Sequence, residues 1–376
     1  MSEEDEELSS QTIPKQKPKE EIEGIDAPED TTWGDFPIDT FLIRTESRTV
    51  FDVVRRIEQG SFVMDPDFQR DFIWPKDKQS KLVESVLMRI PLPVFYLAED
   101  DRGNMVVVDG LQRLSTFRRF FENKLRLKLP EHSELHKKLF KDLSPKLKNR
   151  VEDCNLILYI IDSKVPERAR LDIFERVNGG VPLTRQQMRN CLYMGQATRF
   201  LKEEVTSEVF SQATGDSLDS DTMRDREFVN RFLAYYLLPI ADYKGDMDEF
   251  LATALKKINK MHAEEVANLS ALFRKSLMNN YRVFGKHAFR KFTSGQKDRG
   301  ILNASLWDVM TTGLADYETD VVAAKAEVLR EAFLRLLADA QFSNSITYSP
   351  NSTKNAKHRF EAFRAMLKEV FNADPS

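Results

Sequence analysis

The sequence has few of the residues that build metal centres, disulfide frameworks or membrane spans. Among its 376 residues are two cysteines, Cys154 and Cys191, which lie far apart and form no CxxC pair, and only five histidines. This scarcity argues against a structural zinc site. No apolar run approaches the ~18 residues of a membrane helix. The acidic start MSEEDEELSS also lacks the hydrophobic segment of a secretory signal. We therefore expect a cytoplasmic protein without a membrane contact.

The sequence does have a large apolar fraction and an uneven distribution of charge. Hydrophobic residues make up 41% of the chain and include 26 phenylalanines, enough for a sizeable core. Residues 1–32 carry 11 acidic and 3 basic residues, so we expect a disordered acidic tail there. Subtracting this tail from the totals of 60 acidic and 56 basic residues leaves 49 acidic and 53 basic, a net charge of +4. This balance neither excludes nor requires a nucleic-acid partner.

Hydrophobic periodicity divides the ordered part into a mixed region and a helical region. Strand-like apolar runs alternate with helical patterns over residues 33–195, whereas only helical patterns recur over 196–376. We therefore predict an α+β domain followed by an all-α domain. The predicted strands are 94–97, 105–108 and 155–161; the predicted helices are 49–60, 77–90, 111–121, 168–177, 185–193, 197–210, 226–238, 247–267, 269–284, 303–312, 323–340 and 357–371.

The stretch Met105–Phe121 carries the clearest candidate site. A β-branched apolar run ends at Asp109-Gly110, and a helical pattern with Gln112 and Arg113 in its first turn follows. A strand, a glycine turn and a helix start together expose backbone N–H groups toward an anion. A guanidinium there can bind a phosphate with two parallel hydrogen bonds. The alternative is that Asp109 only caps the helix and Arg113 is a surface charge.

Two further segments carry polar or basic residues in an aromatic setting. Gln69 and Arg70 lie in an extended segment between Pro66 and Pro75, and could converge on Gln112 and Arg113. Residues 274–299 contain eight basic residues and one acidic residue, with aromatics interleaved. This second segment could form a DNA-binding face. We favour the alternative that its aromatics belong to the core and its basic residues to the solvated side.

Four motifs lie in order along the first half of the chain: Pro66-Asp-Phe-Gln-Arg70 with Trp74, Lys81-Leu-Val-Glu-Ser85 with Ile90-Pro91, Val108-Asp-Gly-Leu-Gln-Arg113, and Phe174-Glu-Arg-Val-Asn-Gly179 with Leu183-Thr184. Taken together, they resemble the domain of unknown function at the N-terminus of GmrSD-type restriction endonucleases. The order and spacing agree over roughly residues 35–240, although the family's central motif usually reads Asp-Gly-Gln-Gln-Arg and Leu111 replaces its first glutamine here.

The resemblance implies a ParB/sulfiredoxin-like fold with a small mixed sheet. In ParB-like proteins a Gly-x-x-Arg turn binds nucleotide phosphates, which corresponds to Gly110 and Arg113. A later helix completes the site and helps to hold Mg²⁺, which corresponds to Glu175, Arg176 and Asn178. Family members act as nucleotide-stimulated or nucleotide-hydrolysing modules in defence against phage, often joined to an HNH nuclease domain. We find no HNH-type cluster here.

The predicted site therefore contains arginines, amides and carboxylates around a nucleoside triphosphate. Arg70, Arg113 and Arg176 would surround the phosphates, and Gly110, Gln69, Gln112 and Asn178 would offer further contacts. Asp109 and Glu175 are the candidate Mg²⁺ ligands and water-orienting groups. The alternative is that the arginines pair with Asp67, Asp71 and Asp109 to brace loops.

Three functions follow from this site. The first is an NTP-hydrolysing anti-phage module that acts on or senses DNA, with a nuclease or other defence protein as partner; whether it forms a homo-oligomer is left open. The second is a nuclease or nickase that uses the same residues on DNA directly. The third is a non-enzymatic adaptor that binds DNA or protein.

Overall fold

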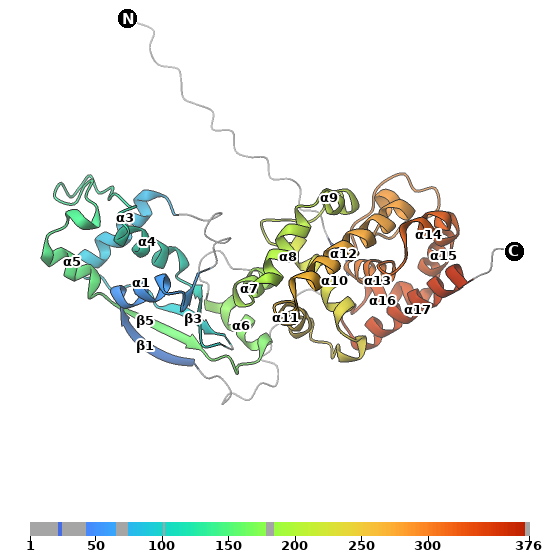
Figure 1. The fold of residues 1–376 in the computed structure, drawn as a ribbon, viewed down its shortest axis with the longest axis horizontal. Coiled ribbons are helices and arrows are strands. Elements are labelled where there is room, and N and C mark those ends of the chain that lie inside the picture. Colours follow the sequence, from blue (N-terminus) through green and yellow to red (C-terminus); the bar gives the residue numbers. More distant parts are fainter. Residues whose placement is uncertain (1–21, 25–42, 65–73, 101, 178–183, 373–376) are drawn as a thin grey trace, which may run out of the picture.

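The computed structural model describes residues 22–24, 43–64, 74–100, 102–177 and 184–372, and it shows two lobes joined side by side (Figure 1). One lobe contains a sheet with helices above it, and the other is helical. The prediction of an α+β fold with a small mixed sheet followed by a helical region is confirmed. None of the helices in these ranges has the length and apolar character that crossing a membrane requires.

The sheet has five strands in the order β1-β5-β3-β4-β2. The pairs β1–β5 and β3–β4 are antiparallel, whereas β5–β3 and β4–β2 are parallel. This arrangement places β4, the strand that leads into the predicted turn, between β3 and the short strand β2. The strands are β1 (Ile43–Thr49), β2 (Phe62–Val63), β3 (Phe95–Glu99), β4 (Met105–Asp109) and β5 (Asn155–Ile161).

Four helices cover one face of the sheet and enclose the N-terminal core. In the first of them, Val50, Val53, Val54 and Ile57 recur at helical spacing and are buried. Their neighbours in this core include Leu97, Val107 and Ile160 of the sheet. The helices are α1 (Val50–Glu58), α3 (Lys76–Leu87), α4 (Leu111–Phe121) and α5 (Pro145–Glu152), with the 3-10 turn η2 (Phe140–Asp142) following α4.

The opposite face of the sheet belongs to a second core that continues into the helical lobe. Ala98, Val108 and Ile161 each follow a residue of the N-terminal core by one position, and they pack in the second cluster. Successive strand residues point to opposite faces, so three strands supply both cores. The helices α6 (Glu167–Val177) and α7 (Arg185–Leu192) pack on this face. The domain boundary at residue 195 stays a prediction, because the second core spans it.

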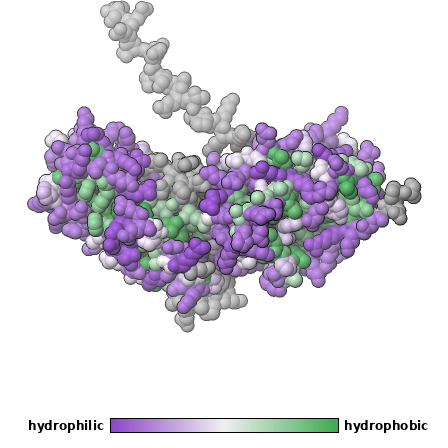
Figure 2. Space-filling view, viewed as in Figure 1, coloured by the Kyte–Doolittle hydropathy of each residue, from purple (hydrophilic) through white to green (hydrophobic). Residues whose placement is uncertain are grey.

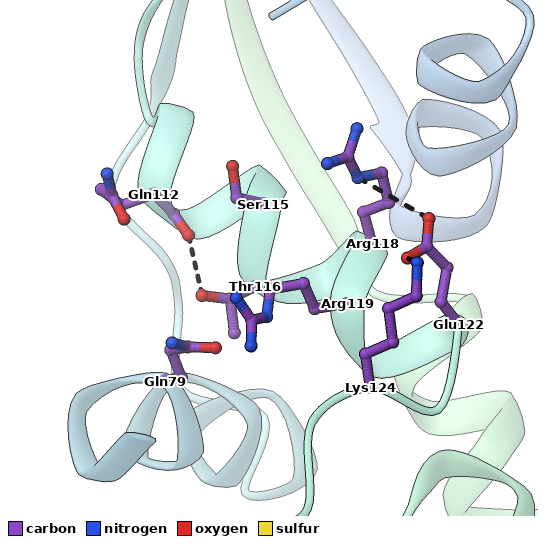
Figure 3. Close-up of a pocket in the computed structure, with 8 residues that line it drawn as sticks. All are labelled: Gln79, Gln112, Ser115, Thr116, Arg118, Arg119, Glu122 and Lys124. Atoms are coloured by element: carbon purple, nitrogen blue, oxygen red, sulfur yellow. Dashed lines mark hydrogen bonds and ion pairs between the residues drawn. The ribbon is translucent and has the colours of Figure 1, made fainter. Parts of the chain in front are cut away.

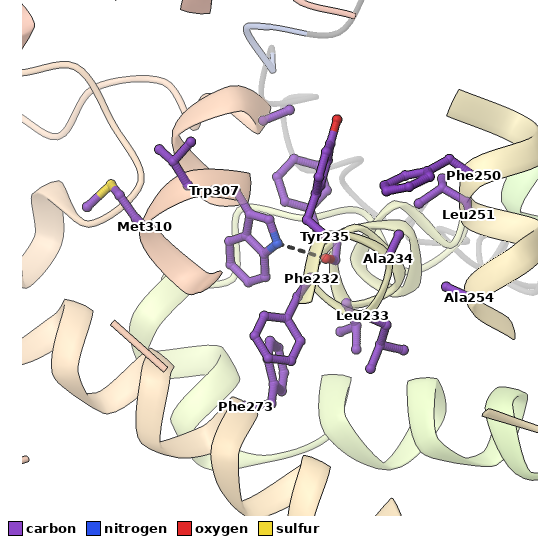
Figure 4. Close-up of a cluster of buried hydrophobic side chains, with 14 of the residues drawn as sticks. Phe232, Leu233, Ala234, Tyr235, Phe250, Leu251, Ala254, Phe273, Trp307 and Met310 are labelled. Atoms are coloured by element: carbon purple, nitrogen blue, oxygen red, sulfur yellow. Dashed lines mark hydrogen bonds between the residues drawn. The ribbon is translucent and has the colours of Figure 1, made fainter. Parts of the chain in front are cut away.

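Large aromatic side chains fill the centre of the helical lobe (Figure 4). Trp307 is fully buried, contacts Phe228 and Phe273 edge-on, and donates its indole N–H to the Phe228 carbonyl at 2.7 Å. The helices of this lobe are α8 (Gln196–Val205), α9 (Glu208–Thr214), α10 (Arg224–Leu237), α11 (Met247–Ile258), α12 (Ala263–Phe284), α13 (Ala304–Gly313), α14 (Thr319–Ala324), α15 (Ala326–Ala338), α16 (Ala340–Thr347) and α17 (Thr353–Asn372), with the 3-10 turns η3 (Ile240–Asp242) and η4 (Gly285–His287).

Several of the predicted helices were wrong in extent, among them 269–284, which begins six residues earlier as α12 (Ala263–Phe284). The pattern at 247–267 breaks after Ile258, because the Asn259 side chain bonds Ala197 N–H and the Tyr193 carbonyl instead of continuing the helix surface. The pattern at 197–210 divides into α8 and α9 where Ser207 caps a new helix. The pattern at 323–340 likewise divides, since α14 ends at Ala324 and α15 begins at Ala326.

A short piece of the expected acidic tail lies on the helical lobe. Glu23 N–H donates to the Leu302 carbonyl at 2.9 Å, and the Glu23 carbonyl accepts from Ala304 N–H at 2.8 Å. Its carboxylate pairs with Lys291 at 2.5 Å. Residues 22–24 therefore differ from the expectation of disorder along the whole of 1–32.

Candidate functional site

The turn between β4 and α4 requires a glycine. Gly110 has φ 94° and ψ 7°, a left-handed conformation that side chains rarely adopt. A Cβ atom there would lie 2.2 Å from Cδ1 of Phe95 on the neighbouring strand. The close approach and the backbone angles together explain why the chain has Gly110 where the strand ends and the helix begins.

The buried side chain of Arg113 holds this turn together through hydrogen bonds. Its guanidinium donates to the Pro93 carbonyl, to the Val94 carbonyl at 3.0 Å and to Asp109 Oδ2 at 2.7 Å. The Phe95 ring covers it at 4.1 Å, and the side chain is 10% exposed. Burial lowers the pKa of Arg113, and Asp109 opposes that shift. These contacts fit the bracing alternative for Arg113, and a role in holding phosphate stays a prediction.

The two other residues of the turn face different surroundings. Leu111, which replaces the family's usual glutamine, packs against the N-terminal core. Gln112 faces outward, and its Oε1 accepts from Trp74 N–H at 3.1 Å. Trp74 directly follows the segment that contains Gln69 and Arg70, which lies outside the described residues. Gln112 thus ties the central motif to the end of the Gln69-Arg70 motif.

A pocket of about 260 Å³ opens on the outer side of α4 (Figure 3). Gln112, Ser115 and Arg119 contribute to it from one side of the helix, and Gln79 contributes from α3. The positions 112, 115 and 119 share a helix face because side chains three and four residues apart are neighbours. The complete lining consists of Gln79, Gln112, Ser115, Thr116, Arg118, Arg119, Glu122 and Lys124.

Several polar atoms of this pocket are buried without a hydrogen-bond partner in the described part of the chain. They include Gln79 Oε1, Ser115 Oγ and Arg119 Nε. Gln79 is 3% exposed and donates its amide N–H to the Trp74 carbonyl at 2.5 Å, which fixes the side chain. Buried polar atoms normally have partners, so these atoms indicate a site for a ligand or for ordered water.

Basic side chains outnumber acidic ones in the pocket. Arg118, Arg119 and Lys124 stand against Glu122 alone, which lies 2.7 Å from Lys124 and 3.8 Å from Arg118. These charges favour an anion with several oxygen atoms. Sequence reasoning missed Ser115 and Arg119 because it stopped at the turn, although their helical spacing from Gln112 was available. Lys124 lies beyond the end of α4 at Phe121, so that spacing gave no signal for it.

The second half of the predicted site is only partly visible. Glu175 and Arg176 belong to α6, but their side chains are outside the described part of the structure, as is Asn178. Their convergence with the α4 pocket therefore stays a prediction. Among the described residues, no group of three or more histidine, cysteine, aspartate or glutamate side chains could hold a metal ion.

Two histidines have a spacing that sequence reasoning overlooked. His132 and His136 stand four residues apart, as metal ligands on a helix do, but they lie in a turn. His132 pairs with Glu84 at 2.7 Å, and His136 Nδ1 accepts from Leu129 N–H at 3.2 Å. Both side chains have structural partners.

The basic segment 274–299 is largely part of the fold. Phe273, Phe284 and Phe289 are buried, as the core interpretation expected. Arg290 is fully buried and donates to three backbone carbonyls and to Ser217. Arg274 pairs with the buried Glu204 at 2.8 Å.

The geometry defines a class of protein: an α+β domain with a strand, glycine turn and helix bearing a basic pocket, followed by a helical lobe. Residues 50–194 match the family described as GmrSD restriction endonuclease, N-terminal domain, and this segment is a domain of that family. The match indicates a restriction-type defence protein. No curated protein matches the chain.

Proposed function

We propose that the N-terminal domain binds the phosphates of a nucleoside triphosphate in the α4 pocket, hydrolyses it with Mg²⁺, and couples this to an action on DNA. The observation that supports the proposal is the set of buried, unpartnered atoms of Gln79, Ser115 and Arg119 beside three basic side chains. The volume of about 260 Å³ is just below the ~300–1,000 Å³ of small-molecule sites. A pocket of this volume suits the phosphate groups of a nucleotide, while the base and the sugar would lie outside the pocket.

Each side chain then has a role in positioning and neutralising charge, which is what phosphoryl transfer needs most. Arg119, Arg118 and Lys124 neutralise phosphate oxygens, and Ser115 and Gln112 donate hydrogen bonds. The Asp109–Arg113 pair fixes the turn that presents these residues. Arg70 and Arg176, with Gln69 and Asn178, are proposed to complete the site from the opposite side.

The proposed site also includes a magnesium ion that is shared with the phosphates. The Asp109 side chain is 32% exposed and engages Arg113 through Oδ2. Mg²⁺ is typically held by one or two carboxylates together with substrate phosphates, so Asp109 and Glu175 would hold it. When bound, the ion neutralises charge on the transferring phosphate.

The proposal is tested by phosphate release from each of the four NTPs with Mg²⁺, and by calorimetric binding of a non-hydrolysable analogue. Arg119→Gln should weaken analogue binding by about tenfold or more, since it removes a charge-assisted contact of ~1.5–3 kcal/mol. The control is Arg335→Gln on the exposed surface of α15. Unchanged affinity in Arg119→Gln, where the parent protein binds the analogue, contradicts the assignment of the pocket.

A nuclease or nickase that acts through the same pocket is a second candidate. It is favoured by Lys124, which lines the pocket and also belongs to an exposed row of basic residues described below. A plasmid-nicking assay on the same sample separates the two candidates. Nicking without NTP hydrolysis supports the second. DNA binding without either activity supports a non-enzymatic adaptor that relies on a partner nuclease.

A further inference from the structure

A basic segment follows α4, and basic residues alternate in it with leucines. Leu125, Leu127 and Leu129 are at most 1% exposed and belong to the N-terminal core. Lys124, Arg126 and Lys128 between them are exposed. In an extended chain alternate side chains point to opposite sides, about 6.6 Å apart on each side. The buried leucines therefore hold three basic side chains in a row on the outside, over about 13 Å of backbone.

A second set of basic residues lies beside this row. Leu127 N–H donates to the Lys138 carbonyl at 3.0 Å, and its own carbonyl accepts from Lys137 N–H at 2.8 Å. Lys141 N–H donates to Asn123 Oδ1 at 2.8 Å, next to Lys124. We call the six exposed residues the basic ridge: Lys124, Arg126, Lys128, Lys137, Lys138 and Lys141.

The ridge stands out from the charge of the whole chain. Residues 118–148 contain ten basic and four acidic residues, a net charge of +6, whereas the chain has −4. Figure 2 shows mostly hydrophilic residues over the visible side of the end that carries α3 and α5. A local excess of one sign on such a surface indicates a polyanionic partner.

The acidic groups near the ridge do not neutralise it. Glu122 lies 2.7 Å from Lys124, Asp77 lies 2.9 Å from Lys128, and Glu131 pairs with Lys81 at 2.5 Å. Of the remaining acidic side chains nearby, Glu134 is exposed and Asp142 accepts from Leu139 N–H. Exposed ion pairs such as Lys128–Asp77, 59% and 62% exposed, contribute at most about 1 kcal/mol. Phosphate can therefore displace them.

We propose that the basic ridge binds the phosphate backbone of duplex DNA, without reading its sequence. One strand of B-DNA carries a phosphate every ~3.4 Å along the axis, so the 13 Å row faces about four phosphates. The aromatic residues at the ridge, Phe121 and Phe140, stack on each other at 4.6 Å, and so are not free to stack on single-stranded bases. The leucines face inward, which leaves no apolar side to enter a lipid surface.

This inference rests on the DNA partner of the proposed function but not on its nucleotide. The test measures binding of a labelled 25-base-pair duplex of arbitrary sequence by fluorescence anisotropy across a series of salt concentrations. The variant is Arg126→Gln/Lys128→Gln/Lys138→Gln, which leaves every residue of the pocket unchanged. The matched control is Lys357→Gln/Arg364→Gln/Lys368→Gln, which removes the same charge from the exposed side of α17.

The ridge variant should bind about tenfold or more weakly at low salt. The slope of log K against log salt should become less steep by about 2.7, or 0.9 for each lost contact. Asp77→Asn/Glu131→Gln, which removes acidic groups bordering the ridge, should bind more tightly. The control should match the parent. Circular dichroism and nucleotide binding check that each variant is folded.

Each other outcome has a definite meaning. If the parent binds the duplex and the ridge variant keeps its affinity and salt slope, DNA binds elsewhere and the ridge assignment is wrong. If the parent binds nucleotide but no duplex, the inference fails while the nucleotide site stands. If single-stranded DNA, duplex RNA or anionic vesicles bind the ridge more tightly than duplex DNA, the assigned partner is wrong.

Discussion

Replacing Arg113 by alanine separates the two roles that this residue could have. The change leaves the carbonyls of Pro93 and Val94 and the carboxylate of Asp109 without the donor they now share. Breaking a buried, hydrogen-bonded ion pair costs about 3–5 kcal/mol, and Asp109 is 32% exposed, which favours the lower end. We therefore expect Arg113→Ala to lower the free energy of unfolding by about 3–4 kcal/mol.

The assay is chemical denaturation followed by far-UV circular dichroism, with Arg335→Ala as the exposed control. A double-mutant cycle with Asp109→Ala should give a coupling energy of about 1–3 kcal/mol. Nucleotide affinity is then measured at a temperature at which the variant is folded. If Arg113→Ala is as stable as the parent within about 0.5 kcal/mol but loses nucleotide affinity, the bracing role is refuted and the arginine contacts the ligand.

Two further substitutions test other parts of the reasoning. Gly110→Ala should cost more than Gly60→Ala, because both impose a positive φ worth about 1–2 kcal/mol but a Cβ at Gly60 meets nothing within 4 Å, whereas at Gly110 it meets Phe95; equal losses on denaturation would contradict the clash. Burial raises the pKa of Asp225 to about 6, so the folded carboxyl keeps a proton that the unfolded one loses near pH 4, and stability falls as pH rises between these values. Asp225→Asn should therefore be up to roughly 3 kcal/mol more stable than the parent at pH 7 and no more stable below pH 4; a gain that is independent of pH would contradict the assigned cause.

Local patterns predicted most of the α+β region because its elements carry their own signals. The central strand is a run of β-branched residues, and Thr184 with Gln187 forms the capping box that the sequence indicated. The strand β1 was missed because its sequence, Ile-Arg-Thr-Glu-Ser-Arg-Thr, has no apolar alternation. Its inward side is held by ion pairs instead: Arg44 lies 2.6 Å from Glu99. An ion-pair partner that lies 55 positions away in the sequence cannot be recognised from a local sequence pattern.

Prediction of the site stopped at the turn for a similar reason. A glycine after a strand is visible in the sequence, and Gly110 has the backbone conformation that its position suggested. The direction in which Arg113 points depends on Pro93 and Val94, which approach only when β3 pairs with β4. From the sequence, side chains further along α4, such as Arg119, have the pattern of ordinary surface charges. Only the tertiary structure places α3 beside them, so that residues of both helices line one pocket.

Adjacent residues of the central motif therefore have different structural roles. Asp109 and Arg113 hold the two sides of the turn together, and Gly110 makes room for the Phe95 ring between them. Leu111, the departure from the family pattern, is partly buried and packs against the core below the same turn. Gln112 is then the member of the motif that faces the pocket and also contacts Trp74. The burial of Arg113 is therefore consistent with a binding role for the motif as a whole. Arg113 supports the first turn of α4 rigidly, and this support fixes the helix face that carries Gln112, Ser115 and Arg119.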